Sequence, residues 1–299
     1  MVVATGFFDG VHLGHRHVIK HLVDAAAVRG VESTVLTFWP HPRNVLQKEA
    51  RDLRLLTTLQ HKKELLMSLG VNHVEVIPFT KDFSTMTVEE YLRDIVIGKY
   101  GGTALLLGYD NKLGCDAKDA DHVARIAESL GLEVIRTDAV SLDPGTAVSS
   151  TKIRNRLLDG DVSGAAEMLG YDYSLYGVVV AGNRLGRTIG FPTANMQLYE
   201  PLKMVPANGV YFVRVQTIDR SLYGMCNIGC RPTVSEGNAR TIETNIFGFD
   251  EDIYGLDMTI SFVEKIRDEI RFDSLDELRE QLGKDRDTCL TLLEMSSRV

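Results

Sequence analysis

Residues 5–15, TGFFDGVHLGH, hold two histidines and three glycines in an arrangement that suits phosphate chemistry. An apolar run at residues 2–4 precedes them and an amphipathic segment at 16–28 follows, which predicts a strand, a glycine turn and a helix. Such a turn presents backbone N–H groups to a phosphate at the positive end of the helix. His12 and His15 add side-chain donors where phosphoryl charge accumulates. The predicted anion site contains these histidines with Gly6, Phe7, Asp9, Gly10 and Gly14.

Two other interpretations of this motif were weighed. A histidine beside a glycine turn can simply cap the helix, although the motif has more fixed positions than a cap requires. Histidine is also a common zinc ligand. The spacing between His12 and His15 is not that of the H-E-x-x-H helix, and no cysteine lies nearby. Both observations argue against metal ligation.

Residues 149–154, SSTKIR, form the second candidate phosphate site. Ser150 and Thr151 place hydroxyls at an expected helix start, and Arg154 follows about one turn later. An ordinary helix cap with a surface arginine would give the same pattern. Together with the upstream histidine motif, however, the pattern favours a nucleotidyl-transfer site, which must hold a triphosphate from two sides while pyrophosphate leaves.

Residues 186–195, GRTIGFPTAN, form the third candidate. Two glycines, Gly186 and Gly190, permit close backbone approach to a phosphate, and Arg187 lies between them. Thr193 and Asn195 offer neutral oxygens of the kind that Mg²⁺ takes in addition to phosphates and water. The alternative is a Gly-Pro hairpin loop, which would suffice for a bare P-T-x-N but not for the full string.

Composition limits the class of protein. The chain has 299 residues, of which 44% are hydrophobic and 25% charged, and its formal net charge is −8. This balance predicts a globular protein of about two domains and disfavours nucleic acid as the main partner. Four widely spaced cysteines indicate reduced thiols and a cytoplasmic location. No stretch reaches the ~18 apolar residues of a membrane span, and no signal peptide is recognisable. Because the first strand starts almost at residue 1, native residues are expected to precede it.

Strands and helices alternate in the first half of the chain. Strands are predicted at residues 2–6, 33–38, 73–78, 103–108 and 133–137, and helices at 15–28, 59–69, 88–98 and 121–130. Capping boxes are expected at Thr57 and Thr87. This alternation predicts a parallel sheet covered by helices on both faces, with its ligand beyond the carboxyl ends of the strands.

The second half has a different rhythm. Helices are predicted at residues 151–158 and 162–169, followed by strands at 177–181, 209–217, 222–228, 241–249 and 258–263. A last helix runs from a capping box at Ser274 to Leu293. Successive strands without helices between them predict an antiparallel barrel. The expected domains are therefore residues 1–172 and 173–299.

With these motifs in place, the chain resembles the bacterial bifunctional riboflavin kinase/FMN adenylyltransferase family over nearly its whole length. Its first half is similar to the H-x-G-H nucleotidyltransferases and its second half to the riboflavin kinase barrel. Further matching strings are TFWPHPR at residues 37–43, GYD at 108–110, NGVY at 208–211, NIGCRPT at 227–233 and RDEIRF at 267–272.

For the first half, the resemblance implies a Rossmann-like domain that transfers AMP from ATP to FMN, giving FAD and pyrophosphate. His12 and His15 would hold the ATP phosphates. The opposite side would be closed by Ser150, Thr151 and Arg154. The flavin pocket would involve Pro40 and Pro42, with Asp110 near the nucleotide.

For the second half, the resemblance implies a barrel that phosphorylates riboflavin to FMN. Glu243 occupies the position that the family uses as general base, although its spacing alone would suit an exposed strand carboxylate. Thr193 and Asn195 would bind the Mg²⁺ that accompanies ATP, and Asn208 would contact the flavin. The sequence departs from the family at 111–116, where aromatic and basic residues are common, and at Asn245, where histidine is common.

Three competing hypotheses remain at this stage. The chain could retain one activity, most plausibly the kinase, because its loop is the more intact. It could sense nucleotides or flavins without turnover, although a sensor has no need of a base such as Glu243. It could also be another H-x-G-H transferase, but that would leave residues 176–272 unexplained. The sequence does not predict an oligomeric state or channelling of FMN.

Overall fold

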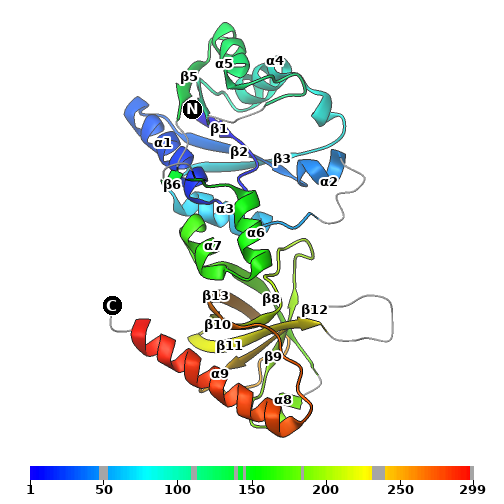
Figure 1. Ribbon diagram of the computed structural model, residues 1–299. Helices are drawn as coiled ribbons and strands as arrows, with labels where there is room; N and C mark the ends of the chain where they lie inside the picture. Colours follow the sequence, from blue (N-terminus) through cyan, green and yellow to red (C-terminus); the bar gives the residue numbers. More distant parts are fainter. Residues whose placement is uncertain are drawn as a thin grey trace. The chain divides into compact units, whose positions relative to one another are not determined.

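The computed structural model describes residues 1–46, 53–108, 113–137, 141–143, 146–182, 185–230 and 240–296. It divides into two compact units, Met1–Ser150 and Thr151–Val299, shown with their elements in Figure 1. The predicted site residue Asp110, the matching residues 231–233 and the departures at 111–112 lie outside the described residues.

The first unit contains a parallel sheet. Its strands are β1 (Val2–Thr5), β2 (Ser33–Trp39), β3 (His73–Pro78), β4 (Ala104–Leu107) and β5 (Glu133–Arg136). Their order is β3-β2-β1-β4-β5, and every pairing is parallel. The strand order therefore reverses at β1, which lies between β2 and β4. Ligands of such sheets bind at this switch point, beyond the carboxyl ends of the strands. The chain that leaves β1 at this place is the predicted glycine turn.

Helices cover both faces of this sheet. Successive side chains of β1 point to opposite faces, so Val2 and Ala4 pack in one core and Val3 in the other. The first core includes residues of α1 (Leu13–Arg29) and α3 (Leu59–Ser68). The second includes residues of α4 (Val88–Glu90), the π-helical η3 (Tyr91–Lys99) and α5 (Ala120–Ser129). The doubly covered parallel sheet predicted from the sequence is confirmed. Short elements that were not predicted are α2 (Pro42–Leu46), η2 (Phe83–Thr85), β6 (Ser141–Asp143) and β7 (Thr146–Ala147).

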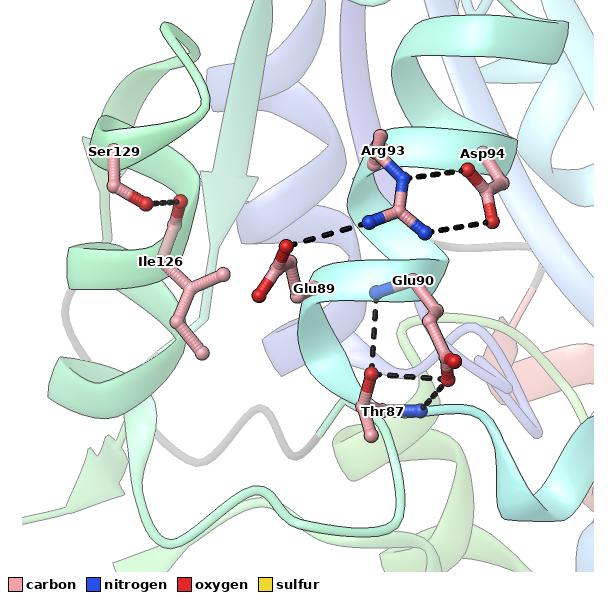
Figure 2. Close-up of polar contacts among 7 residues, drawn as sticks. All are labelled: Thr87, Glu89, Glu90, Arg93, Asp94, Ile126 and Ser129. Atoms are coloured by element: carbon pink, nitrogen blue, oxygen red, sulfur yellow. Dashed lines mark hydrogen bonds and ion pairs between the residues drawn. The ribbon is translucent and has the colours of Figure 1, made fainter.

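The capping box at Thr87 is confirmed (Figure 2). The Glu90 backbone N–H donates to the Thr87 hydroxyl, and the Glu90 carboxylate accepts from the Thr87 N–H at 2.9 Å. That backbone donor holds the pKa of Glu90 below its usual range. One turn on, Arg93 forms ion pairs with Glu89 and Asp94. The two bonds of the capping box satisfy the amides of Thr87 and Glu90 at the start of a helix that presents Tyr91 and Leu92 to the core.

The capping box predicted at Thr57 is wrong. Thr58 is the N-cap of α3, and its side chain accepts from the His61 N–H. The Thr57 hydroxyl instead donates to Asp9 and accepts from the Gly10 N–H. Thr57 and Thr58 could each cap the helix by residue type. The contact of Thr57 with the glycine turn leaves Thr58 as the cap.

The second unit contains a closed antiparallel barrel in the order β10-β11-β12-β9-β8-β13. Its strands are β8 (Ser174–Val180), β9 (Ala194–Leu198), β10 (Gly209–Gln216), β11 (Ser221–Cys230), β12 (Arg240–Ile246) and β13 (Asp257–Arg267). The helices are α6 (Ser150–Asp159), α7 (Val162–Leu169), α8 (Leu185–Thr188) and α9 (Leu275–Ser296). The predicted barrel is confirmed. Strand β9 was not predicted from the sequence, yet this short strand closes the barrel by pairing with β8 and β12.

The C-terminal helix α9 packs against the barrel (Figure 1). Cys289 is fully buried in a core that includes Phe212 and Met225. Arg267 at the end of β13 forms an ion pair with Asp285 of α9, whose side chain is 1% exposed. The Ser274 hydroxyl accepts from the Glu277 N–H, but the Glu277 carboxylate accepts from the N–H of the residue before Ser274. The predicted third capping box is thus only half formed. Within the described residues, no helix has the length and apolarity to span a bilayer.

Candidate functional sites

The glycine turn after β1 has an unusual backbone. Gly10 has φ 83°, and the non-glycine residues Phe8 and Val11 have φ 53° and 38°. For residues with a side chain this left-handed region costs roughly 1–2 kcal/mol each. Phe8 and Val11 are nevertheless buried, 7% and 0% exposed, in the core shared with α1. Packing and hydrogen bonds therefore hold the turn in a conformation that its residues do not favour by themselves.

Asp9 supplies those hydrogen bonds. Its carboxylate accepts from the N–H groups of Leu56 and Thr57 at 3.0 and 3.1 Å and from the Thr57 hydroxyl at 3.2 Å. The Gly10 N–H donates to the same hydroxyl. The Ser150 hydroxyl donates to the Asp9 carbonyl oxygen at 3.0 Å. The structure thus brings Asp9, Gly10 and Ser150 together, with the Asp9 carboxylate bonded to the segment before α3.

His12 is the N-cap of α1. Its Nδ1 atom accepts from the His15 N–H at 3.3 Å, so Nε2 carries the proton of the neutral ring. The imidazoles of His12 and His15 are stacked, with centroids 3.6 Å apart. A Cβ atom on Gly14 would lie 3.3 Å from the His12 ring, so this position requires a small residue. The capping role that the sequence analysis treated as an alternative is therefore present together with the predicted histidine pair.

His15 is held neutral. Burial, then the neighbouring His12, then Lys62 lower its pKa well below the usual value. Its Nδ1 atom is buried and has no hydrogen-bond partner among the described residues. An imidazole in this environment can act as a hydrogen-bond donor but does not carry a fixed positive charge at neutral pH.

Lys62 is a residue that the sequence analysis missed. It lies in α3, is 1% exposed, and donates from Nζ to the Phe7 carbonyl oxygen at 2.9 Å and to the Thr37 hydroxyl at 3.0 Å. The ammonium lies over the Phe7 ring, 3.9 Å from its centroid. The available signal was its position: Lys62 and Leu66 share the buried side of α3 at i and i+4 spacing.

The predicted flavin segment lies beside this turn. His41, between Pro40 and Pro42, makes an edge-to-face contact with Phe7 at a centroid distance of 4.0 Å. Thr151 and Arg154 lie on α6 within the second unit, and their approach to His12 stays a prediction.

In the second unit, the chain between β8 and β9 makes a tight glycine loop. A Cβ atom on Gly186 would collide with the Phe191 carbonyl oxygen, so only glycine fits there. The Phe191 N–H closes the loop by donating to the Gly186 carbonyl at 2.8 Å. Gly190 has φ 84°, and the side chain of Arg187 is exposed. The Asn245 amide donates to the Pro192 carbonyl at 2.7 Å, which ties the loop to β12.

Glu243 lies in a polar row across three neighbouring strands. It is paired in register with Asn195 of β9 on one side and with Asn227 of β11 on the other. Side chains of directly paired residues point to the same face of a sheet. The structure therefore brings together the predicted base and one of the two predicted metal ligands.

A cavity of about 230 Å³ opens beside Glu243. Thr193 lines this cavity and also a neighbouring pocket that includes Arg187. The cavity has mainly apolar walls with a few polar groups, as expected of a small-molecule site. Its lining residues include Glu243, Asn227, Thr193, Ile189, Phe191, Val210, Met225, Ile270, Phe272, Leu278 and Leu282.

Asn208 is not among the residues that line the cavity. Its amide donates to the carboxylate of Glu269 at 3.1 Å, and Glu269 does line it. Arg240 donates to the Asn208 side-chain oxygen at 3.0 Å. Arg267 also lines the cavity. Arg267 and Glu269 belong to a string that the sequence analysis matched to the family without assigning either a role.

The structure thus has two candidate sites, a glycine turn with two histidines at the switch point of a Rossmann-like sheet and a carboxylate-containing cavity in a barrel, as expected of a transferase with two phosphate-handling sites. Comparison with known proteins agrees with this division. A family model described as FAD synthetase matches residues 1–152, and one described as riboflavin kinase matches residues 169–293.

Relatives match over nearly the whole chain. Proteins named bifunctional riboflavin kinase/FMN adenylyltransferase from Listeria monocytogenes and Bacillus subtilis are each 35% identical, covering 95% of this chain and 90% of theirs. The Escherichia coli protein of that name is 33% identical with the same coverage. A solved structure described as a macrolide-efflux protein from Streptococcus pneumoniae has a TM-score of 0.90 at 32% identity, covering 96% of this chain and 93% of that one. The chain belongs to the bifunctional riboflavin kinase/FMN adenylyltransferase family, as its sequence motifs implied.

Proposed function

We propose that each half of the chain carries one step of flavin cofactor synthesis at its own site. The second half phosphorylates riboflavin to FMN, and the first half transfers AMP from ATP to FMN, which gives FAD and pyrophosphate. The observation that supports this division is the presence of two different constellations, the stacked His12–His15 pair in one unit and the Glu243–Asn195 pair in the other. The substrates are small molecules: riboflavin, FMN and ATP.

In the adenylyl-transfer site, the work is positioning and charge stabilisation. The FMN phosphate is already anionic and attacks the α-phosphorus of ATP without a general base. Gly6, Phe7, Gly10 and Gly14 shape the turn around the phosphates, while the N–H groups of Gly6 and Gly10 donate within the protein, to the Leu36 carbonyl and the Thr57 hydroxyl. His12 and His15 donate to phosphate oxygens. Asp9 supports this turn through the segment before α3, so we assign it an anchoring role.

Other parts of this site rest on the family motif. Ser150, Thr151 and Arg154 close on the triphosphate from the start of α6, and Pro40 and Pro42 wall the flavin pocket beside Phe7. The Ser150 contact with the Asp9 carbonyl supports the first of these assignments. Asp110, which lies outside the described residues, is proposed near the nucleotide on the motif alone.

In the kinase site, the riboflavin 5′-hydroxyl must lose a proton while it attacks the γ-phosphorus. Glu243 is the proposed base because it lies on the wall of the cavity. The apolar walls take the flavin ring, and Asn208 acts on the flavin by holding Glu269. Gly186, Arg187 and Gly190 form the loop that covers the ATP phosphates.

The residues around Thr193 fit Mg²⁺. Thr193 and Asn195 supply neutral oxygens, and Asn195 lies in register with the Glu243 carboxylate. Among the described residues no group of three or more His, Cys, Asp or Glu side chains could hold a metal. Mg²⁺ takes few protein oxygens and completes its coordination with phosphates and water. When bound, Mg²⁺ would neutralise charge on the ATP phosphates.

We place the domain boundary after residue 172, close to where the riboflavin kinase match begins at residue 169. We also propose a cytoplasmic location. The four cysteines are free, and burial raises the pKa of the Cys226 thiol to about 12, which suits a packing role in a reducing compartment. Cys230, by contrast, is exposed.

The test is to supply riboflavin, ATP and Mg²⁺, separate the flavins, and repeat the assay with FMN in place of riboflavin. Both FMN and FAD are expected from riboflavin, and FAD from FMN. The alternative of a kinase alone predicts FMN but no FAD from either flavin.

A further inference from the structure

Lys62 presents a problem of charge. It is enclosed in the first unit, and among the described residues no carboxylate lies within ion-pair distance of its Nζ atom. Its two hydrogen-bond acceptors, the Phe7 carbonyl and the Thr37 hydroxyl, are neutral. Burial of an ammonium among neutral groups opposes its charged form, so such lysines are uncommon without a reason.

The position of this lysine supplies the reason. Phe7 lies in the turn after β1, and Thr37 lies near the carboxyl end of β2, so the ammonium joins two neighbouring strand ends at the switch point of the sheet. The Thr37 hydroxyl also donates to the Phe7 carbonyl at 3.2 Å, which makes a closed triangle of polar groups under the turn. No third hydrogen-bond partner of Nζ is found in the described part of the chain.

We propose that Lys62 is a positioning residue for adenylyl transfer. Its buried ammonium fixes the Phe7 end of the phosphate-binding turn, and its positive charge attracts the anionic phosphates of the substrates. This inference deepens the proposed function of the first unit and rests on it. The role differs from that of His12 and His15, which are assigned direct contacts with phosphate. Lys62 acts through the turn and through its electric field.

The electrostatics agree with this geometry. Burial lowers the pKa of Lys62 to about 8, and the Asp9 carboxylate raises it by a smaller amount. The charged and titratable groups that face it are Asp9 of the turn and His15 of α1, the latter stacked on His12. Positive charge on Lys62 in turn helps to keep His15 neutral. A phosphate anion bound at the turn would favour the protonated lysine, so binding and protonation are linked.

The first test is the pH dependence of FAD formation from FMN and ATP. In the native enzyme, kcat/KM should fall as pH rises above about 8, because the free enzyme then loses the charge of Lys62. K62M keeps the length of the side chain and removes the charge. It should lower kcat/KM about tenfold or more at pH 7 and lack this alkaline limb. K63M is the matched control, because it removes the same charge from the next, less buried position of α3 and should behave as the native enzyme.

Stability separates this role from a purely structural one. Since K62M removes a buried, unpaired charge, its midpoint of thermal unfolding should equal or exceed that of the native protein. A lysine kept only for structure predicts a lower midpoint. Equal kcat/KM values and the same alkaline limb in K62M and the native enzyme would overturn the proposal.

A second measurement needs no variant and covers the case in which K62M does not fold. The native protein, labelled with ¹³C-lysine, is titrated by NMR with and without inorganic pyrophosphate. A lysine that titrates near pH 8 should shift to a higher midpoint when pyrophosphate is present. His15 does not change its charge near pH 8, because its pKa is well below the usual value, so its titration does not affect the midpoint measured for the lysine. No such lysine, or no shift with pyrophosphate, would contradict the proposal.

The outcomes distinguish a failure of the proposed function from a failure of the role of Lys62. If the native enzyme makes no FAD from FMN at any pH, adenylyl transfer itself is wrong. If FAD forms and K62M matches the native enzyme, only the role of Lys62 is wrong.

Discussion

The two proposed sites differ in the chemistry of their side chains. The first has a strained turn, two stacked imidazoles and a buried ammonium, and the Asp9 carboxylate there is bonded to backbone N–H groups. The second has the Glu243 carboxylate on a cavity wall beside neutral oxygens. This difference fits the two proposed nucleophiles, since a phosphate that is already anionic needs only donors and positive charge, whereas a hydroxyl needs a base.

The largest effect is expected at Glu243. E243Q keeps the shape of the side chain but cannot accept the proton, so FMN formation from riboflavin should fall about 10²–10⁴-fold. FAD formation from supplied FMN should persist. The measurement is the rate of each step by flavin chromatography. E264Q is the control, because Glu264 is an exposed barrel carboxylate on β13. Near-native FMN formation by E243Q would remove Glu243 from the role of base.

The counterpart in the first unit is His15. H15A should lower FAD formation from FMN about a hundredfold, as expected on losing a donor to developing charge. FMN formation from riboflavin should survive. H21A tests an exposed histidine further along α1 and should leave both rates near native. Should H15A also abolish FMN formation, the assignment of one activity to each half would be wrong.

A smaller effect tests the anchor of the strained turn. D9N replaces one acceptor oxygen with an amide donor facing the N–H groups of Leu56 and Thr57. The unfolding free energy of the first unit should fall by about 2 kcal/mol. Trp39, the single tryptophan of the chain, lies at the end of β2, so its fluorescence during denaturant unfolding reports on this unit. An unchanged midpoint and slope would show that the turn does not depend on Asp9.

The smallest effect concerns pH and stability. Because the folded-state pKa of His15 is lowered, the unfolded chain binds more protons below its ordinary pKa of about 6.5. The unfolding free energy of the first unit should therefore decrease as pH falls from about 6.5 to the folded-state pKa of His15. The total decrease should be about 1.4 kcal/mol for each unit by which the pKa in the folded protein lies below that in the unfolded chain. Trp39 fluorescence in the native protein and in H15Q measures this. If the unfolding free energy changes equally with pH in the native protein and in H15Q, the lowered pKa of His15 is contradicted.

The sequence allowed good prediction wherever the signal was local. The strand, glycine turn and helix around His12, the capping box at Thr87 and the antiparallel strands after Ser174 all follow from patterns within a few residues. Helix α7 was predicted with its observed bounds, Val162–Leu169.

What the sequence did not reveal depends on contacts between distant segments. Lys62 was taken as one residue of an amphipathic helix, since only the fold places it under the turn after β1. The cap shifted from Thr57 to Thr58 because Asp9, far away in sequence, engages Thr57. Strand β9 was not predicted, because its place in the sheet comes from its pairing with β8 and β12.

Mixing two full-length variants, each inactivated at one of the two sites, tests the central claim most directly. H15A and E243Q are each incubated with riboflavin, ATP and Mg²⁺, separately and then together, and FAD is quantified. Neither variant alone should produce FAD at an appreciable rate, whereas the mixture should, because FMN released by H15A is adenylylated by E243Q. If H15A forms no FMN, E243Q forms no FAD from supplied FMN, and the mixture stays without FAD, the two sites are not independent and the account is wrong.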